Sequence, residues 1–187
     1  MFNKSEKKII LEIAKNAIKE AILGIKIIDR DRLIQSYPFL KEEGAVFVTI
    51  NEFNSLRGCI GSLVAYRSLI DDIISNAKSA ALNDPRFKPI SKDELDNLKV
   101  EVSILTPPVK VEYRNIEDLK SKIEPSVDGV ILELNGYRAT YLPSVWEQVG
   151  DFDLFFDSLC QKAGLSGNCL LNHPTIYKYQ AVKVQDE

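Results

Sequence analysis

Arginine, cysteine and aspartate side chains in two short segments are the groups of this chain best suited to chemistry. Arg57 and Cys59 lie two residues apart, and a regular strand would project both side chains from the same face. A guanidinium beside a thiol favours the thiolate and lowers the pKa of the cysteine. We therefore interpret Cys59 as a candidate nucleophile or ligand anchor, with a pKa lowered by Arg57 and by Arg86 farther along the chain.

The cysteine segment also fits a structural role. Gly58 and Gly61 flank Cys59, and glycine weakens a strand unless a bulge or a close neighbour requires it. Cys59 would then pack as a small hydrophobic residue, whereas in the catalytic alternative the two glycines would contact substrate. Spacing alone favours the structural role, because the single histidine, His173, lies far away in sequence and no other general base accompanies the thiol.

The second segment is a proline-bracketed loop from Asn83 to Pro89. Pro85 disfavours helical geometry at the preceding residue, so the helix before it must end here. Asp84 could act as a catalytic carboxylate, and Arg86 with Arg57 could grip a phosphate or carboxylate. Mutual pairing of Asp84 and Arg86 explains both residues equally well. We expect the loop to approach the cysteine, because the helix after the first hairpin returns the chain along the sheet.

Other polar and aromatic residues have weaker claims to function. Glu147 is a candidate acid or base beside Trp146, which more often fills a core than binds a base. Cys169 and His173 are spaced four apart, but a metal needs three or four protein ligands, so we expect no metal site. Cys160 is expected to be an inert core thiol. Four tyrosines are expected to pack on sheet faces rather than to stack on nucleic acid: Tyr137, Tyr141, Tyr177 and Tyr179.

The composition is that of an ordinary globular chain. Its 187 residues are 45% hydrophobic and 27% charged, with a formal net charge of −3, which suits one domain spanning the whole chain. The charges alternate in sign without forming a basic face, which argues against broad nucleic-acid binding. No apolar run approaches the roughly 20 residues that cross a bilayer. Three cysteines without a C-x-x-C pair indicate reduced thiols, and we expect a cytoplasmic protein.

Hydrophobic periodicity predicts two antiparallel hairpins, each followed by an amphipathic helix. Strands are predicted at 45–50 and 56–63, at 130–134 and 137–142, and also at 100–104 and 175–184. Helices are predicted at 3–24, 68–83, 91–98, 115–123, 143–146 and 152–163. The hairpins favour an α+β fold with flanking helices over a doubly wound parallel sheet.

Two motifs in this chain are unusually specific. The sequence Leu-Arg-Gly-Cys-Ile-Gly occupies 56–61, and Asn-Asp-Pro-Arg-Phe occupies 83–87. Further distinctive segments are Phe47–Thr49, Val102–Leu105, Leu142–Glu147 and Cys160–Leu165. With these motifs the chain resembles the AMMECR family, and the resemblance extends from about Ala45 to Tyr179.

The resemblance implies a two-lobed α+β fold, with the lobes intimately packed and one shared cleft near the cysteine motif. It also implies association with a Memo-type protein and a radical SAM enzyme, while it supplies neither a reaction nor a cofactor. We therefore expect an enzyme or enzyme subunit that modifies a macromolecule or metabolite together with these partners. The alternatives are a non-catalytic binding or scaffold module for a partner enzyme, and a nucleic-acid-binding protein.

The chain departs from the family pattern at two positions. Asn168-Cys169-Leu170 stands where similar proteins often have a tryptophan, and Asp128 stands before Gly129 where many have a histidine. A mechanism that requires either of those side chains has no support in this sequence.

Overall fold

The computed structural model of the chain describes residues 2–186. These residues form two compact units: the first runs as far as Leu105 and includes the C-terminal residues from Val182, and the second runs from Thr106 to Ala181. Each unit contains a four-stranded sheet, with strand orders β2-β1-β3-β8 and β4-β7-β5-β6. The hairpins are antiparallel and the helices flank the sheets, so the predicted α+β class is confirmed.

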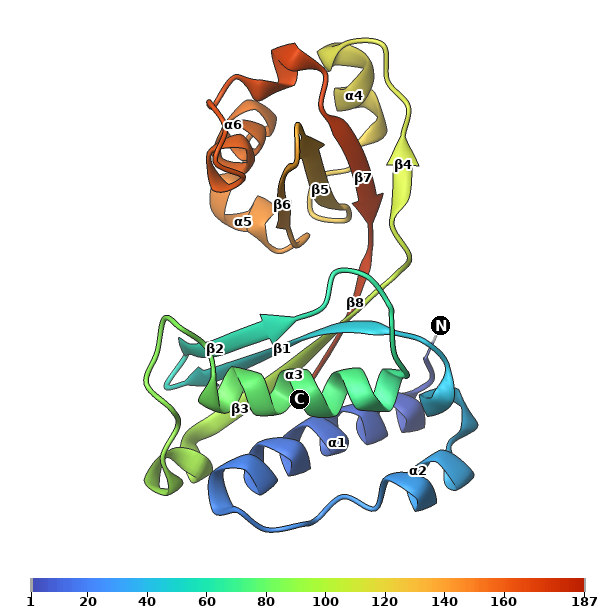
Figure 1. The fold of residues 1–187 in the computed structure, drawn as a ribbon, viewed down its shortest axis with the longest axis vertical. Helices are drawn as coiled ribbons and strands as arrows, with labels where there is room; N and C mark the ends of the chain where they lie inside the picture. Colours follow the sequence, from blue (N-terminus) through green and yellow to red (C-terminus); the bar gives the residue numbers. More distant parts are fainter. Residues whose placement is uncertain (1, 187) are drawn as a thin grey trace. The chain divides into compact units, whose positions relative to one another are not determined.

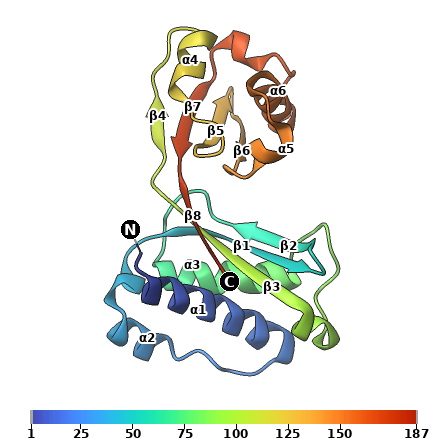
Figure 2. The same cartoon turned by 180° about the vertical axis from the view of Figure 1, so that it is seen from behind.

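Two long helices cover one face of the sheet in the first unit (Figure 1) and remain on that face in the opposite view (Figure 2). They are α1 (Lys4–Leu23) and α3 (Leu69–Leu82). The strands are β1 (Ala45–Glu52), β2 (Ser55–Gly61), β3 (Leu98–Leu105) and β8 (Ala181–Gln185). Buried aliphatic side chains fill the space between these layers, among them Ile10, Ile13 and Ala17 of α1, Ile70 and Ile73 of α3, and Val46, Val48 and Ile50 of β1.

The helix boundaries in the first unit follow from local capping. Asn3 and Glu6 form a capping box at the start of α1, and Gly24 ends the helix with a φ of 67°. Ser68 caps α3. Shorter helices complete the unit: α2 (Arg30–Ser36), η1 (Pro38–Lys41) and η2 (Lys92–Asn97). The sequence pattern did not predict α2, which has no buried residue to mark a periodic face.

The second unit encloses an aromatic core. Its strands are β4 (Val109–Val111), β5 (Gly129–Leu134), β6 (Tyr137–Tyr141) and β7 (Thr175–Tyr179), and its helices are α4 (Ile116–Lys122), α5 (Val145–Val149), α6 (Phe152–Lys162) and η3 (Cys169–Asn172). The Trp146 ring stacks on Phe155 with 3.6 Å between ring centroids. Its indole N–H donates to the Asp128 carbonyl at 2.8 Å. The prediction that Trp146 fills a core is confirmed.

Two predictions for the C-terminal half are wrong. The strand predicted at 175–184 is two strands, because β7 pairs in one sheet and β8 in the other. The break falls at Gln180, whose backbone exchanges hydrogen bonds with Thr106. Cys160 is not a free thiol, because it forms a disulfide with Cys169. A buried cysteine on α6 and another on η3 meet in three dimensions, although their spacing gave no sign of a disulfide.

Candidate functional site

Two side chains from the loop after α3 form hydrogen bonds with the Cys59 backbone, on the side of β2 that faces away from β1. The Cys59 N–H donates to Asp84 Oδ2 at 2.9 Å, and Arg86 Nη2 donates to the Cys59 carbonyl at 3.2 Å. Because β2 is an edge strand, these backbone groups would otherwise remain open to another chain. The Asp84–Arg86 pair therefore supplies the acceptor and donor that a neighbouring strand would provide.

Asp84 is buried and fully hydrogen bonded. Its Oδ1 accepts from the Arg86 backbone N–H at 3.1 Å and from Nε at 3.0 Å, and its Oδ2 accepts from Nη2 at 2.8 Å. These hydrogen bonds from Arg86, with that from the Cys59 N–H, hold the pKa of Asp84 well below its ordinary value despite burial. Asp84 thus remains a carboxylate and cannot donate a proton near neutral pH.

The Cys59 thiol is half-buried beside a hydroxyl. Thr49 lies directly across the β1–β2 pair, and its Oγ1 is 3.3 Å from Cys59 Sγ. Burial raises the pKa of Cys59 above its ordinary value, and the opposing effects of the Thr49 hydrogen bond and the Arg86 charge do not reverse that direction. The prediction that the cysteine motif lowers this pKa is therefore wrong, because desolvation outweighs the nearby cation.

Arg57 does not accompany the thiol. Asn51 pairs with Leu56 and Ile50 with Gly58, so Arg57 is the extra residue of a β-bulge. Its Nε donates to Glu94 Oε1 at 2.6 Å, and its guanidinium also donates to the carbonyls of residues 88 and 89. The hydrogen bonds from Arg57 and Ser91 lower the pKa of Glu94 to about 2. Arg57 therefore anchors the loop and η2 to β2.

The two glycines of the motif are required by close packing. A Cβ atom at position 58 would lie 2.1 Å from the Ala80 carbonyl oxygen of α3. A Cβ atom at position 61 would lie 2.3 Å from the Phe47 ring, which is its cross-strand neighbour. Both the bulge and the close helix of the structural alternative are thus present, and Gly58 and Gly61 have structural reasons that need no substrate.

Glu147 belongs to a different part of the molecule. It lies on α5 in the second unit and is exposed, whereas the cysteine cluster lies in the first unit. His173 also belongs to the second unit, where its ring stacks on Tyr113 at 4.2 Å and Nε2 contacts the Tyr113 carbonyl at 3.0 Å. The cluster in the first unit therefore consists of Cys59, Asp84 and Arg86.

Sequence patterns missed Thr49, the pairing of Glu94 with Arg57, and a buried carboxylate, Asp72. Asp72 lies in the first turn of α3, where it resembles an ordinary helix-start acid. In the structure it is fully buried and accepts hydrogen bonds from the Val46 N–H, Arg67 and Asn76 at 2.8, 2.7 and 3.0 Å. Strand register could have identified Thr49, but nothing local distinguishes Asp72 as buried.

Comparisons with known proteins identify the family. The AMMECR1 family model matches residues 11–184. The chain belongs to the AMMECR1 family. A family member from Methanothermobacter thermautotrophicus is 39% identical over 96% of this chain and 93% of that protein. Protein PH0010 from Pyrococcus horikoshii is 37% identical, over 95% of this chain and 88% of its own length.

A solved family structure has the same fold. The crystal structure of the uncharacterised protein PH0010 from Pyrococcus horikoshii superposes with a TM-score of 0.83 at 35% identity, over 94% of this chain and 88% of that chain. The recognition of the family from the cysteine and Asp-Pro-Arg-Phe motifs is confirmed.

Within residues 2–186, no helix is long and apolar enough to cross a membrane. In the same residues, no group of three or more His, Cys, Asp or Glu side chains is placed to hold a metal ion.

Proposed function

We propose that this AMMECR1-family protein is a non-catalytic recognition subunit that works with a Memo-type protein and a radical SAM enzyme in modifying a macromolecule or metabolite. The residue that we expect to contact the partner is Arg86. Asp84 holds Nε and Nη2 of this residue, and the guanidinium lies 5.4 Å from the centre of the Phe87 ring. The side chain nevertheless remains 54% exposed. A guanidinium held in this way is preorganised to bind a partner.

The free edge of this guanidinium defines the ligand chemistry. Within residues 2–186, Nη1 of Arg86 has no hydrogen-bond partner. An arginine N–H is a donor only, so it suits a carbonyl, carboxylate or phosphate oxygen of the bound partner or substrate. Arg57 cannot complete a two-arginine clamp, because Glu94 and two backbone carbonyls occupy its guanidinium.

The position of the thiol supports recognition over nucleophilic catalysis. Cys59 has a raised pKa, and its hydrogen-bonding neighbour Thr49 is not a general base. Asp84 is occupied by Arg86 and by the Cys59 N–H. An enzyme with Cys59 as its nucleophile is the second candidate, favoured by the hydroxyl at 3.3 Å and by the charge of Arg86 beside the thiol.

The experiment is calorimetric binding of the full chain to the purified Memo-type protein and radical SAM enzyme of the same genome. We expect Arg86→Gln to weaken binding about tenfold or more, because a hydrogen bond to a charged group contributes about 1.5–3 kcal/mol. Lys88→Gln, a nearby exposed cation, is the matched charge control. Cys59→Ala should retain wild-type affinity. The absence of binding to both proteins, or equal binding by wild type and Arg86→Gln, contradicts the proposal.

A further inference from the structure

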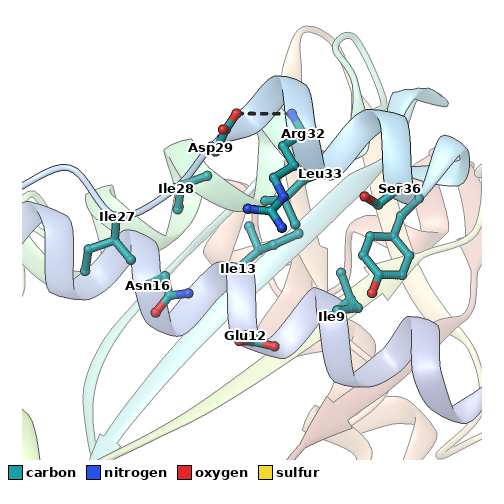
Figure 3. A pocket seen from close by; sticks show the side chains of 11 residues that line it. Ile9, Glu12, Ile13, Asn16, Ile27, Ile28, Asp29, Arg32, Leu33 and Ser36 are labelled. Atoms are coloured by element: carbon teal, nitrogen blue, oxygen red, sulfur yellow. Dashed lines mark hydrogen bonds between the residues drawn. The ribbon is translucent and has the colours of Figure 1, made fainter.

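A hollow of about 420 Å³ lies in the first unit between α1 and the segment that contains α2 (Figure 3). Its volume falls within the range of about 300–1,000 Å³ that is usual for small-molecule sites. Aliphatic and polar side chains line it together: Ile9, Glu12, Ile13, Asn16, Ile27, Ile28, Asp29, Arg32, Leu33, Ser36 and Tyr37. It shares no residue with the cysteine cluster, so a ligand bound here would not contact that cluster.

Hydrogen bonds from two helices hold the walls of the hollow. Glu20 of α1 accepts from the backbone N–H groups of Ile27 and Ile28, each at 2.7 Å. Arg30, at the start of α2, donates to both carboxylate oxygens of Asp71 on α3 at 2.7 and 2.8 Å. These contacts fix the outer segment to α1 and to α3, so the hollow is built before any ligand binds.

The aliphatic part of the lining suits a branched hydrocarbon body. Ile13 and Ile28 are buried, and Ile9 and Leu33 are partly buried against the core. Ile27 is 41% exposed. A ligand that covered it would remove apolar surface from water, which favours binding.

Among residues 2–186, no side chain pairs with the guanidinium that lines the hollow. Arg32 extends from α2 toward α1 (Figure 3), yet its guanidinium makes no hydrogen bond or ion pair with any side chain in residues 2–186. Its neighbour Arg30, by contrast, donates to Asp71 from Nε and Nη2, and its Nη1 lies 3.6 Å from Asp31. Asp29 uses its Oδ1 to cap α2 by accepting from the Arg32 backbone N–H at 3.1 Å. The Arg32 guanidinium therefore suits a ligand carboxylate.

Glu12 supplies the opposite charge in the same hollow. It is exposed on α1, and within the described residues no cation pairs with it. A purely anionic ligand would lie near the carboxylates of Glu12 and Asp29, whereas a zwitterion satisfies both signs. We propose that this hollow binds a free amino acid with a branched aliphatic side chain, its carboxylate on Arg32, its ammonium on Glu12 and its side chain against the isoleucines.

The proposal is tested by methyl NMR of the full chain titrated with L-leucine. Two analogues isolate the charges: 4-methylpentanoate lacks the ammonium, and 3-methylbutylamine lacks the carboxylate. We expect leucine to shift the methyl signals of Ile9, Ile13, Ile27 and Ile28 with one saturable affinity. Each analogue should bind at least about tenfold more weakly, since each loses one charge-assisted hydrogen bond.

Three variants assign the charges. Arg32→Gln should weaken leucine about tenfold and leave 3-methylbutylamine unchanged, whereas Glu12→Gln should weaken leucine and leave 4-methylpentanoate unchanged or bound more tightly. Lys26→Gln, an exposed cation outside the lining, should change nothing. Should Arg32→Gln fail to fold, Glu12→Gln and the two analogues still decide the matter. The proposal is overturned if leucine shifts none of these methyls up to its solubility limit, or if leucine and both analogues bind alike.

Discussion

Replacing Asp84 by asparagine should open the outer edge of β2. The substitution removes a charged acceptor of the Cys59 N–H, and a hydrogen bond to a charged group contributes about 1.5–3 kcal/mol. It also removes the ion pair with Arg86, whose exposure limits that contribution to about 1 kcal/mol. We therefore expect Asp84→Asn to lower the free energy of unfolding of the first unit by about 2–4 kcal/mol at pH 7.

The decrease in the free energy of unfolding caused by Asp84→Asn should become smaller as the pH falls. The pKa of Asp84 is lowered in the folded chain, so its stabilisation is complete above the unfolded value of about 3.9 and decreases as pH falls below it. The difference between wild type and Asp84→Asn should shrink by about 1 kcal/mol between pH 7 and pH 3. Urea unfolding followed by far-UV circular dichroism measures this difference, and amide exchange at Cys59 reports the edge itself.

Asp31→Asn is the control for the loss of a charge. The Asp31 side chain is 87% exposed in the same unit, so this change should alter the free energy of unfolding by no more than about 0.5 kcal/mol. The interpretation of Asp84 as an edge cap is refuted if Asp84→Asn costs no more than this control, or if its cost is the same at both pH values.

Three further predictions concern packing and local geometry. Gly58→Ala should lower the free energy of unfolding by about 1–3 kcal/mol in urea unfolding, because the new methyl group would meet the Ala80 carbonyl; an unchanged midpoint contradicts this. Cys169→Ser should destabilise the second unit by about 2–3 kcal/mol, since it opens the disulfide to Cys160. Urea unfolding followed by Trp146 fluorescence measures this change, and an unchanged unfolding midpoint contradicts it. Phe53→Gly should raise the free energy of unfolding by about 0.5–1 kcal/mol, because Phe53 has a φ of 48° and is 77% exposed; a lower melting temperature contradicts it.

The helices and hairpins that the sequence predicted well are those whose ends are marked by residues close together in the chain. Asn3 and Glu6 sit three residues apart and form the capping box of α1, and Asn135-Gly136 supplies the two positive φ angles of the second hairpin. These signals need no knowledge of the tertiary fold. The strand orders and the two-unit division depend on contacts between distant segments, which no local pattern records.

The sequence predicted only part of the candidate site's membership, since Arg57 pairs with Glu94 and Glu147 lies in the other unit, and it did not predict the site's chemistry. The helix and hairpin before the loop bring Asp84 and Arg86 to Cys59, as expected. A one-residue bulge directs Arg57 to Glu94 instead, and alternation along a regular strand cannot reveal a bulge. The pKa of Cys59 depends on burial by residues far away in sequence, so its direction could not be read from neighbouring charges.

The most direct test of a recognition role for the cysteine motif is the pH dependence of Cys59 alkylation in the native full chain. Cys160 and Cys169 form a disulfide, so Cys59 is the free thiol that iodoacetamide can label, and peptide mass spectrometry gives its rate. Because burial raises its pKa, the rate should still be rising at pH values above about 8.5, the ordinary pKa of cysteine. A rate that reaches its plateau below that pH, and loses this behaviour in Arg86→Gln, would show an activated nucleophile and contradict the account.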